Sequence, residues 1–289
     1  MDIVRIYELF PTNDDCIDHL EKVRWANKPR CPYCKSLNAT PLPKERRHHC
    51  NNCNTSFSVT VGTIFHHTHL PLQKWFLAVT LILNAKKGIS SRQLSRDLHV
   101  NKDTAWRIAM QIRKAMTERG QRELLTGLVE ADETYIGGKP RKGTGTHKRG
   151  RGTSKVPVVG MVERKGRVKA EVMRHKKLNS KNLKSLIRRN VDITDTTLIT
   201  DEYKGYIGIQ KIMSHKIVDH TVWYVDGDTH TNTIESFWAL LKRGIVGQFH
   251  KVSLRYLPRY IDEFCYRYNY RFIDDLFSLT IKKGLGVML

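Results

Sequence analysis

The chain lacks a long hydrophobic run and any recognisable export signal. Its apolar stretch AVTLILNA is far shorter than the roughly 18 residues that a membrane-spanning helix needs. Its first residues, MDIVRIYELF, do not show the basic and then apolar order of a secretory signal. We therefore expect no membrane association and place the protein in the cytosol, associated with the nucleoid.

Acidic residues are few relative to basic ones. Lys and Arg total 50 against 28 Asp and Glu, a formal charge of +22 at pH 7. Such a surplus attracts polyanions, and its concentration in particular segments favours nucleic acid over a membrane surface. One such segment, residues 137–155, is rich in glycine and contains no acid, so it cannot build a core. Its expected contacts to the DNA backbone are Lys139, Arg141, Lys142, Lys148, Arg149 and Arg151.

Cysteine is also scarce, and most of it falls in one motif. The pattern C-x2-C-x15-C-x2-C is formed by Cys31, Cys34, Cys50 and Cys53. This spacing is typical of four-cysteine zinc sites, and four thiolates close the coordination tetrahedron. We therefore expect one structural Zn²⁺. Cys16 and Cys265 lie far apart in apolar helical patterns and are interpreted as buried thiols, whereas His48 and His49 are expected to face solvent or phosphate.

The first part of the chain divides into an N-terminal helix (1–27), a zinc ribbon (28–62) and a helical region (70–120). Helices are predicted over 12–26, with Thr12 or Asn13 as cap, and over 71–86; the ribbon should end in a strand near SFSVTVGT. Residues 89–117 then predict two helices joined by a short turn, typical of a helix-turn-helix, although an ordinary helical hairpin has the same pattern. The side chains expected on its exposed, DNA-facing side are Lys102, Arg107, Gln111 and Arg113.

From about residue 127 the pattern changes to strands. Three strand candidates are followed by a helix, a strand, a short helical stretch, another strand and a helix at 230–242. The order βββαβαβα is that of the ribonuclease-H-like fold, a mixed five-stranded sheet with flanking helices. We assign this α/β domain to residues 127–278.

Three acidic residues form the candidate catalytic site. Asp132 and Asp201 adjoin apolar strands, where a rigid sheet can aim their side chains, and Glu235 lies on a predicted helix. Carboxylates about 4 Å apart repel by several kcal/mol at intermediate dielectric, and divalent cations remove that cost. We therefore expect Mg²⁺ or Mn²⁺, as two ions roughly 3.5–4 Å apart, serving cleavage of a phosphodiester.

The third position has two candidates. Asn232 and Glu235 are three residues apart and share a helix face. Lys242 lies about 20° off the stripe of Glu235 but about 80° off that of Asn232. This geometry favours Glu235 as the metal ligand beside a phosphate-contacting Lys242, with Asn232 left as the alternative. Trp238 is interpreted as a core side chain.

Taken together, these motifs resemble bacterial insertion-sequence transposases of the ISXO2-like kind, which combine an N-terminal zinc ribbon with a DDE-type catalytic domain. The resemblance covers residues 16–275. It rests on the cysteine quartet, VTVGTIFHHTHLPLQKW, ISSRQLSRDLHVNKDTAW, EADETYIGGK, TDEYKGY, HTNTIESFWALLKRGIVGQFHKVS and LRYLPRYIDEFCYRYNYR. The family's two aspartates match Asp132 and Asp201, and its third residue, Glu or Asn, is followed by Lys.

The resemblance implies cleavage at the ends of a mobile element and strand transfer into target DNA. The partners would be the terminal repeats and the target, and joining two ends implies a dimer or a higher assembly on DNA. Two other functions remain open at this point. One is a non-catalytic DNA-binding regulator that retains the ribbon and helices of a transposase, and the other is a simple nuclease.

Overall fold

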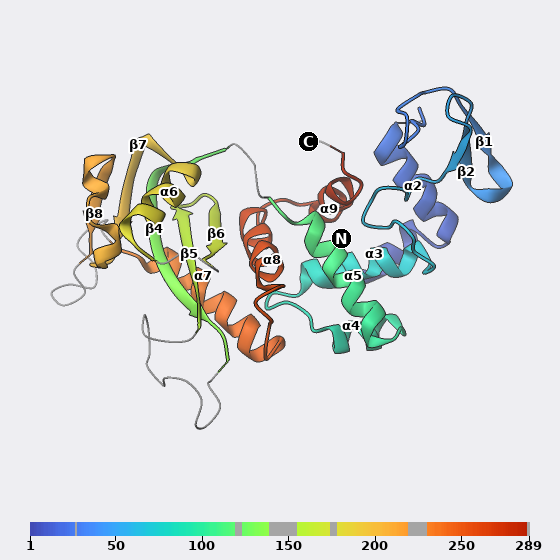
Figure 1. Cartoon of the computed structure of the whole chain (residues 1–289). Helices are drawn as coiled ribbons and strands as arrows, with labels where there is room; N and C mark the ends of the chain where they lie inside the picture. The colour runs from blue at the N-terminus through green and yellow to red at the C-terminus, as the bar shows by residue number, and fades with distance from the viewer. Residues whose placement is uncertain (27, 119–122, 139–154, 174–177, 219–229, 288–289) are drawn as a thin grey trace. The chain divides into compact units, whose positions relative to one another are not determined.

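The computed structural model describes all residues except 27, 119–122, 139–154, 174–177, 219–229 and 288–289 (Figure 1). It contains two compact units. The first comprises Met1–Thr117 with Phe272–Leu289, and the second comprises Glu118–Arg271. Among the helices of the described residues, none combines the length and apolar character that crossing a lipid bilayer requires.

The first unit begins with helices α1 (Ile3–Leu9) and α2 (Asn13–Trp25). Thr12 and Asp15 form a capping box at the start of α2: the Thr12 hydroxyl accepts from the Asp15 amide at 3.2 Å, and the Asp15 carboxylate accepts from the Thr12 amide at 2.8 Å. The predicted helix over 12–26 is therefore confirmed. Helix α1, which the sequence pattern did not reveal, is capped by Asp2.

The zinc-ribbon segment forms an antiparallel sheet of three short strands, β1 (Ala39–Leu42), β2 (Arg47–Cys50) and β3 (Thr55–Phe57). A 3-10 turn, η1 (Pro43–Glu45), joins the first two strands. The strand expected near SFSVTVGT ends at Phe57, because hydrogen-bonded turns such as Val61 N–H to Ser58 C=O follow directly.

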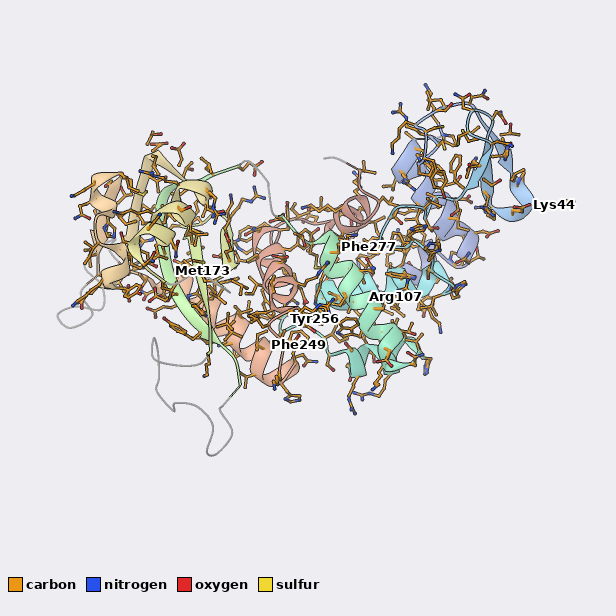
Figure 2. The ribbon with its side chains drawn as sticks, viewed as in Figure 1. Lys44, Arg107, Met173, Phe249, Tyr256 and Phe277 are labelled. Atoms are coloured by element: carbon orange, nitrogen blue, oxygen red, sulfur yellow. The ribbon has the colours of Figure 1, made fainter. Side chains whose placement is uncertain are left out.

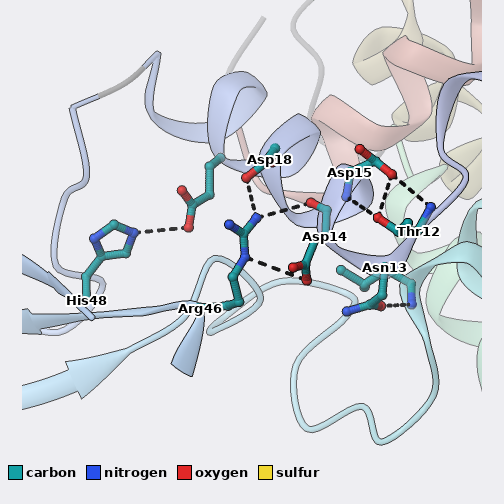
Figure 3. Close-up of polar contacts among 9 residues, drawn as sticks. Thr12, Asn13, Asp14, Asp15, Asp18, Arg46 and His48 are labelled. Atoms are coloured by element: carbon teal, nitrogen blue, oxygen red, sulfur yellow. Dashed lines mark hydrogen bonds and ion pairs between the residues drawn. The ribbon is translucent and has the colours of Figure 1, made fainter. Parts of the chain in front are cut away.

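Two basic side chains of the ribbon contact the acidic face of α2 (Figure 3). Arg46 bonds to the Asp18 carboxylate, and His48 Nε2 lies 3.0 Å from Glu21 Oε1. His48 is 8% exposed and stacks on Phe57, with 5.7 Å between ring centroids. The expectation that His48 faces solvent or phosphate is therefore wrong, because its ring packs between the ribbon and α2.

The other helices of this unit are α3 (Leu72–Asn84), α4 (Ser91–Leu98), α5 (Lys102–Ala115) and α9 (Leu276–Gly284). Helices α4 and α5 form where the sequence predicts them, capped by Ser90 and Asn101. Between them His99 adopts a left-handed conformation with φ of 48°. The ring centroid of Phe277 on α9, which Figure 2 labels, lies 5.4 Å from that of Phe76 on α3. Helix α9 therefore belongs to the first unit, and the second unit ends at Arg271 and not at the expected residue 278.

The second unit is built on one mixed sheet. Its strands are β4 (Leu125–Ile136), β5 (Val156–Glu163), β6 (Val168–Val172), β7 (Val191–Thr200) and β8 (Ser214–Ile217). They lie in the order β6-β5-β4-β7-β8; β4, β5 and β6 pair antiparallel, and β7 pairs parallel with both β4 and β8. This is the ribonuclease-H-like topology that the order of predicted elements indicates.

Three helices accompany this sheet, α6 (Ser180–Asn190), α7 (Asn232–Arg243) and α8 (Leu257–Asn269). Short 3-10 turns η3 (Lys204–Tyr206) and η4 (Ile209–Lys211) follow β7, and a π-helical turn, η5 (Gly244–Gln248), follows α7. Val129 and Ala131 of β4 share a core with α6 residues Leu183 and Leu186. Because alternate side chains of a strand point to opposite faces, the even-numbered residues of this part of β4 face α7 instead.

Candidate active site and zinc site

The four cysteines of the motif meet at one point. Their sulfur atoms all lie within 4.8 Å of one another. Cys31 Sγ is 3.6 Å from Cys53 Sγ, and Cys34 Sγ is 3.5 Å from Cys50 Sγ. A tetrahedral Zn²⁺ with Zn–S bonds of about 2.3 Å separates its sulfurs by about 3.8 Å. The quartet therefore fits one Zn²⁺ with four protein ligands.

The backbone around Cys50 favours the thiolate that binds metal. The pKa of Cys50 is lowered to about 6, first by a hydrogen bond from the backbone N–H of Cys53, with a further one from Asn52, while burial opposes the shift. A thiolate is the form in which cysteine ligates zinc. The turn from Cys50 to Cys53 thus supplies two ligands and also the N–H groups that stabilise the Cys50 thiolate.

Asp132 lies on β4, and Asp201 directly follows the neighbouring parallel strand β7. Ala131 of β4 is opposite Thr200 of β7 in the parallel register. The residues that follow these two are Asp132 and Asp201. Asp201 directly follows the end of β7, and its Oδ1 accepts a hydrogen bond from the Tyr203 amide at 3.1 Å. The sheet therefore aligns two carboxylates that are distant in sequence.

The carboxylate of Asp132 is strongly perturbed by its surroundings. Its pKa is raised from 3.8 to about 7, first by burial and next by the neighbouring Glu133, with smaller contributions from Asp201 and Glu235. A hydrogen bond from the Glu133 amide to Asp132 Oδ1, at 2.7 Å, opposes the shift. Asp201 and Glu235 therefore both lie within electrostatic range of Asp132. Perturbed carboxylates of this kind concentrate at functional sites.

Trp238 and Gly160 position Asp132. Trp238 is 2% exposed, which confirms it as a core side chain, and its Nε1 also donates to Asp132 Oδ2 at 3.1 Å. Gly160 is the β5 partner of Asp132. A Cβ atom at Gly160 would lie 2.6 Å from the Trp238 ring and 3.1 Å from Ile234 Cδ1. The glycine is therefore what allows α7 to approach the sheet closely at this point.

We expect Gly160→Ala to destabilise the second unit by ~1–3 kcal/mol, because the added methyl group forces the buried Trp238 ring or α7 to move. Thermal unfolding of the zinc-loaded protein measures this change. Gly247→Ala is the matched control, because within the described residues no atom would lie within 4 Å of the added Cβ. Equal melting temperatures for the two variants would contradict the close approach.

Asp132→Asn should stabilise the protein at pH 8 in the absence of added Mg²⁺ or Mn²⁺. Because the pKa of Asp132 is raised to about 7, the folded protein loses stability as pH rises from about 4 to above 7 and the buried carboxylate ionises. Asparagine keeps an oxygen acceptor for Trp238 and carries no charge. We expect the free energy of unfolding to rise by ~2 kcal/mol at pH 8, a figure already reduced for the partial exposure of the carboxylate. This gain disappears below pH ~4.

Denaturant unfolding of the zinc-loaded variants at a series of pH values tests this expectation. The exposed Asp195 of β7 supplies the control Asp195→Asn, which should show no gain that grows with pH. A gain for Asp132→Asn that is the same at pH 4 and pH 8 would show that ionisation of this carboxylate is not the cause.

Helix α7 carries both candidates for the third position. Asn232 and Glu235 are exposed, and Glu235 Oε1 accepts a hydrogen bond from the Thr231 hydroxyl at 3.0 Å. Glu235 lies one turn before Trp238, the residue that contacts Asp132. Lys242 is exposed in the last turn of the same helix.

Sequence reasoning missed Glu130, which lies two residues before Asp132 on the same strand face. It is completely buried, and its carboxylate accepts hydrogen bonds from Arg164 Nε at 2.8 Å and from the Thr233 and Ile234 amides at 2.8 and 3.0 Å. The available signal was an acidic residue inside an apolar strand, at the alternate position to Asp132. Gly160, inside the apolar run VPVVGMV, was a similar signal.

The structure places part of the predicted DNA-binding set. Lys102 and Arg107 are exposed on α5 and Gln111 is half-buried (Figure 2 labels Arg107). Arg113 is 1% exposed, so its expected place on the DNA-facing side is wrong. The reason is helical spacing: Arg113 follows Ala105 and Ala109 at intervals of four, on the buried stripe. The remaining predicted contacts lie outside the described residues: Lys139, Arg141, Lys142, Lys148, Arg149 and Arg151.

Comparison with known families agrees with this geometry. Residues 124–269, about half of the 289-residue chain, match the ISXO2-like transposase domain, and residues 11–56 match a transposase zinc-ribbon domain. The chain therefore belongs to the ISXO2-like transposase family, whose members are DNA transposases. The cysteine quartet is that of the family's zinc ribbon.

Individual proteins are similar over most of the chain. The uncharacterised protein in transposable element ISH50 of Halobacterium salinarum is 29% identical over 241 residues, covering 78% of this chain and 80% of that protein. Because this relative is archaeal, the shared motifs do not by themselves mark a bacterial host.

Among solved structures, a pre-cleavage Mos1 transpososome is similar at a TM-score of 0.31 and 12% identity, covering 73% of this chain and 78% of that chain. The Mos1 strand transfer complex has a TM-score of 0.32 and 13% identity, covering 73% and 75%. These likenesses are too distant to assign residues, so the roles proposed below rest on the geometry of this chain.

Proposed function

We propose that this transposase cleaves phosphodiester bonds at the ends of its element and transfers the freed strands into target DNA, with Mg²⁺ or Mn²⁺ held by Asp132, Asp201 and Glu235. The observation that carries the proposal is the register of β4 and β7, which brings Asp201 beside Asp132, together with the raised pKa of Asp132, to which Asp201 and Glu235 both contribute. The two alternative functions are a non-catalytic regulator and a simple nuclease, and the experiment below distinguishes them from strand transfer.

The donor set suits a hard divalent cation. Carboxylate oxygens are the ligands that Mg²⁺ and Mn²⁺ prefer, and mutual repulsion among the acids is relieved when a cation binds between them. When bound, two such ions would supply activation of the attacking oxygen and stabilisation of the leaving oxygen in an in-line displacement.

The chain's own residues hold this site in place. The Trp238 indole and the Glu133 amide each donate to a different oxygen of Asp132, which fixes the carboxylate plane. The Tyr203 amide does the same for one oxygen of Asp201. We assign the third ligand to Glu235, because it lies one turn before Trp238, the α7 residue that contacts Asp132, and Asn232 becomes a polar neighbour. Lys242 would contact a DNA phosphate.

DNA recognition would belong mainly to the first unit. The zinc ribbon and helices α4 and α5 would bind the terminal repeats, with Lys102, Arg107 and Gln111 facing the DNA, and the basic segment 139–151 would contact its backbone. Phosphate contacts of this kind make binding depend strongly on salt. Because two element ends must be joined, we infer at least a dimer on DNA.

The test uses labelled duplexes that carry the sequences flanking this coding region, incubated with a target plasmid and Mg²⁺ or Mn²⁺. Strand transfer products support the proposal. Cleavage without joining would instead identify a nuclease, and binding without any cleavage would identify a regulator. Inverted repeats in the flanking sequences would identify the substrate directly.

A further inference from the structure

Helix α7 begins without a cap from its own chain segment. Within the described residues, the side chain of its N-cap residue Thr231 accepts no hydrogen bond from the first amides of the helix; its hydroxyl donates to the Glu235 carboxylate instead. The first amides of a helix have no partner inside the helix and need one elsewhere. Here Glu130 Oε2 accepts from the amides of Thr233 and Ile234 at 2.8 and 3.0 Å. These are the second and third helical residues, whose amides an N-cap side chain normally satisfies.

The other oxygen of Glu130 ties the same helix start to the end of β5. Oε1 accepts from Arg164 Nε at 2.8 Å and from the Thr233 hydroxyl at 2.9 Å. Arg164 Nη2 in turn donates to the carbonyl oxygen of His230 at 3.0 Å. Glu130 is completely buried, and a buried carboxylate persists when it is paired with a cation and hydrogen-bonded, as here. The positive end of the helix dipole stabilises the same charge.

Glu130 and Asp132 are two residues apart on β4, so both point to the face covered by α7. One face of β4 therefore holds the start of α7 through Glu130 and also carries Asp132 of the candidate active site. Glu235 lies in the first turns of that helix, just beyond the two anchored amides.

We propose that Glu130 is a positioning residue, which caps α7 from the neighbouring strand and thereby holds Glu235 in place to share divalent ions with Asp132. The inference rests on the proposed function, because it concerns the metal-binding role of these carboxylates. It assigns Glu130 no contact with metal or DNA. Replacing the Glu130 carboxylate should therefore weaken metal binding without removing any metal ligand.

Glu130→Gln tests this role, because the amide keeps the shape but presents a donor to Arg164 or to the helix amides. We expect Mn²⁺ binding by the zinc-loaded full chain, followed by loss of the free Mn²⁺ paramagnetic resonance signal, to weaken about 10–100-fold. Strand transfer should fall by a similar factor and recover in part at high Mn²⁺. Mn²⁺ affinity equal to that of the wild type would overturn the proposal, whatever happens to activity.

Thr233→Val provides a milder variant if Glu130→Gln does not fold, as judged by circular dichroism. It removes one hydrogen bond to Glu130 and should weaken Mn²⁺ binding in the same direction by a smaller factor; unchanged affinity would count against the proposal. Glu171→Gln is the matched control, since the side chain of Glu171 is 41% exposed on β6 and pairs with Arg189 at the surface.

Full activity in Asp201→Ala would refute the proposed function itself, whereas an inactive Asp201→Ala beside an unaffected Glu130→Gln would refute the positioning role alone.

Discussion

Asp201→Ala is expected to abolish cleavage and strand transfer while binding to element ends stays near the wild-type level. Asp201 follows the end of β7 beside Asp132, where it would hold a divalent ion against the scissile phosphate. A bound metal ion contributes several kcal/mol to transition-state stabilisation, and about 4 kcal/mol corresponds to a loss on the order of 10³-fold. End binding should persist, because the residues proposed to recognise the terminal repeats lie mainly in the other unit. Gel analysis of labelled ends measures the chemistry, and fluorescence anisotropy measures the binding.

Asp195→Ala is the control on the same strand, since Asp195 is exposed and precedes the buried end of β7. It should retain wild-type strand transfer. The same assay assigns the third position: Glu235→Ala should lose activity as severely as Asp201→Ala, and Asn232→Ala should lose less than about tenfold. Wild-type cleavage by Asp201→Ala would exclude a role for this residue in holding metal.

Loss of zinc is expected to unfold the ribbon and to abolish recognition of element ends. The ribbon's core is small, with Cys31, Cys50 and Phe57 as its buried members. Structural zinc contributes about 10–16 kcal/mol in small peptides, far more than such a core provides. In Cys50→Ser we therefore expect zinc content to fall from one ion per chain towards zero and the affinity for terminal repeats to approach that for unrelated DNA.

Metal analysis by mass spectrometry and anisotropy at fixed salt measure these two quantities. Cys16→Ala is the matched control, because Cys16 is buried in α2 outside the quartet and its thiol has a pKa raised to about 12 by burial. It should keep one zinc ion and the binding of ends. Specific end binding by zinc-free Cys50→Ser would show that the ribbon has no part in recognition.

Local signals in the sequence predicted many elements well. Capping residues such as Thr12, Ser90 and Asn101 mark helix starts, because their side chains satisfy amides within three residues of themselves. The cysteine spacing predicts the metal site for the same reason, since each C-x2-C pair closes its own turn. Arg113 is an exception: its charge predicts an exposed side chain, but its spacing from Ala105 and Ala109 places it on the buried face of α5.

Other features depended on contacts between distant segments. Helix α1 is too short to show a clear periodic pattern. Helix α9 belongs to the first unit because it packs against α2, α3 and α5, which are distant in sequence. Neither helix could therefore be assigned to this unit from local patterns. The full length of β7 from Val191 follows from its pairing with β4 at Leu125, which no local pattern shows.

From the sequence alone came most of the elements, their order, the zinc ligands and the candidate acids, because helix caps, strand alternation and metal-ligand spacing are properties of neighbouring residues. Tertiary structure decided how these acids are placed and what holds them. The parallel register of β4 and β7 aligns Asp132 with Asp201, and the absence of a side chain at Gly160 admits Trp238. The carboxylate of Glu130 takes over the capping of a helix some hundred residues later, a pairing that arises only when the strand and the helix pack together.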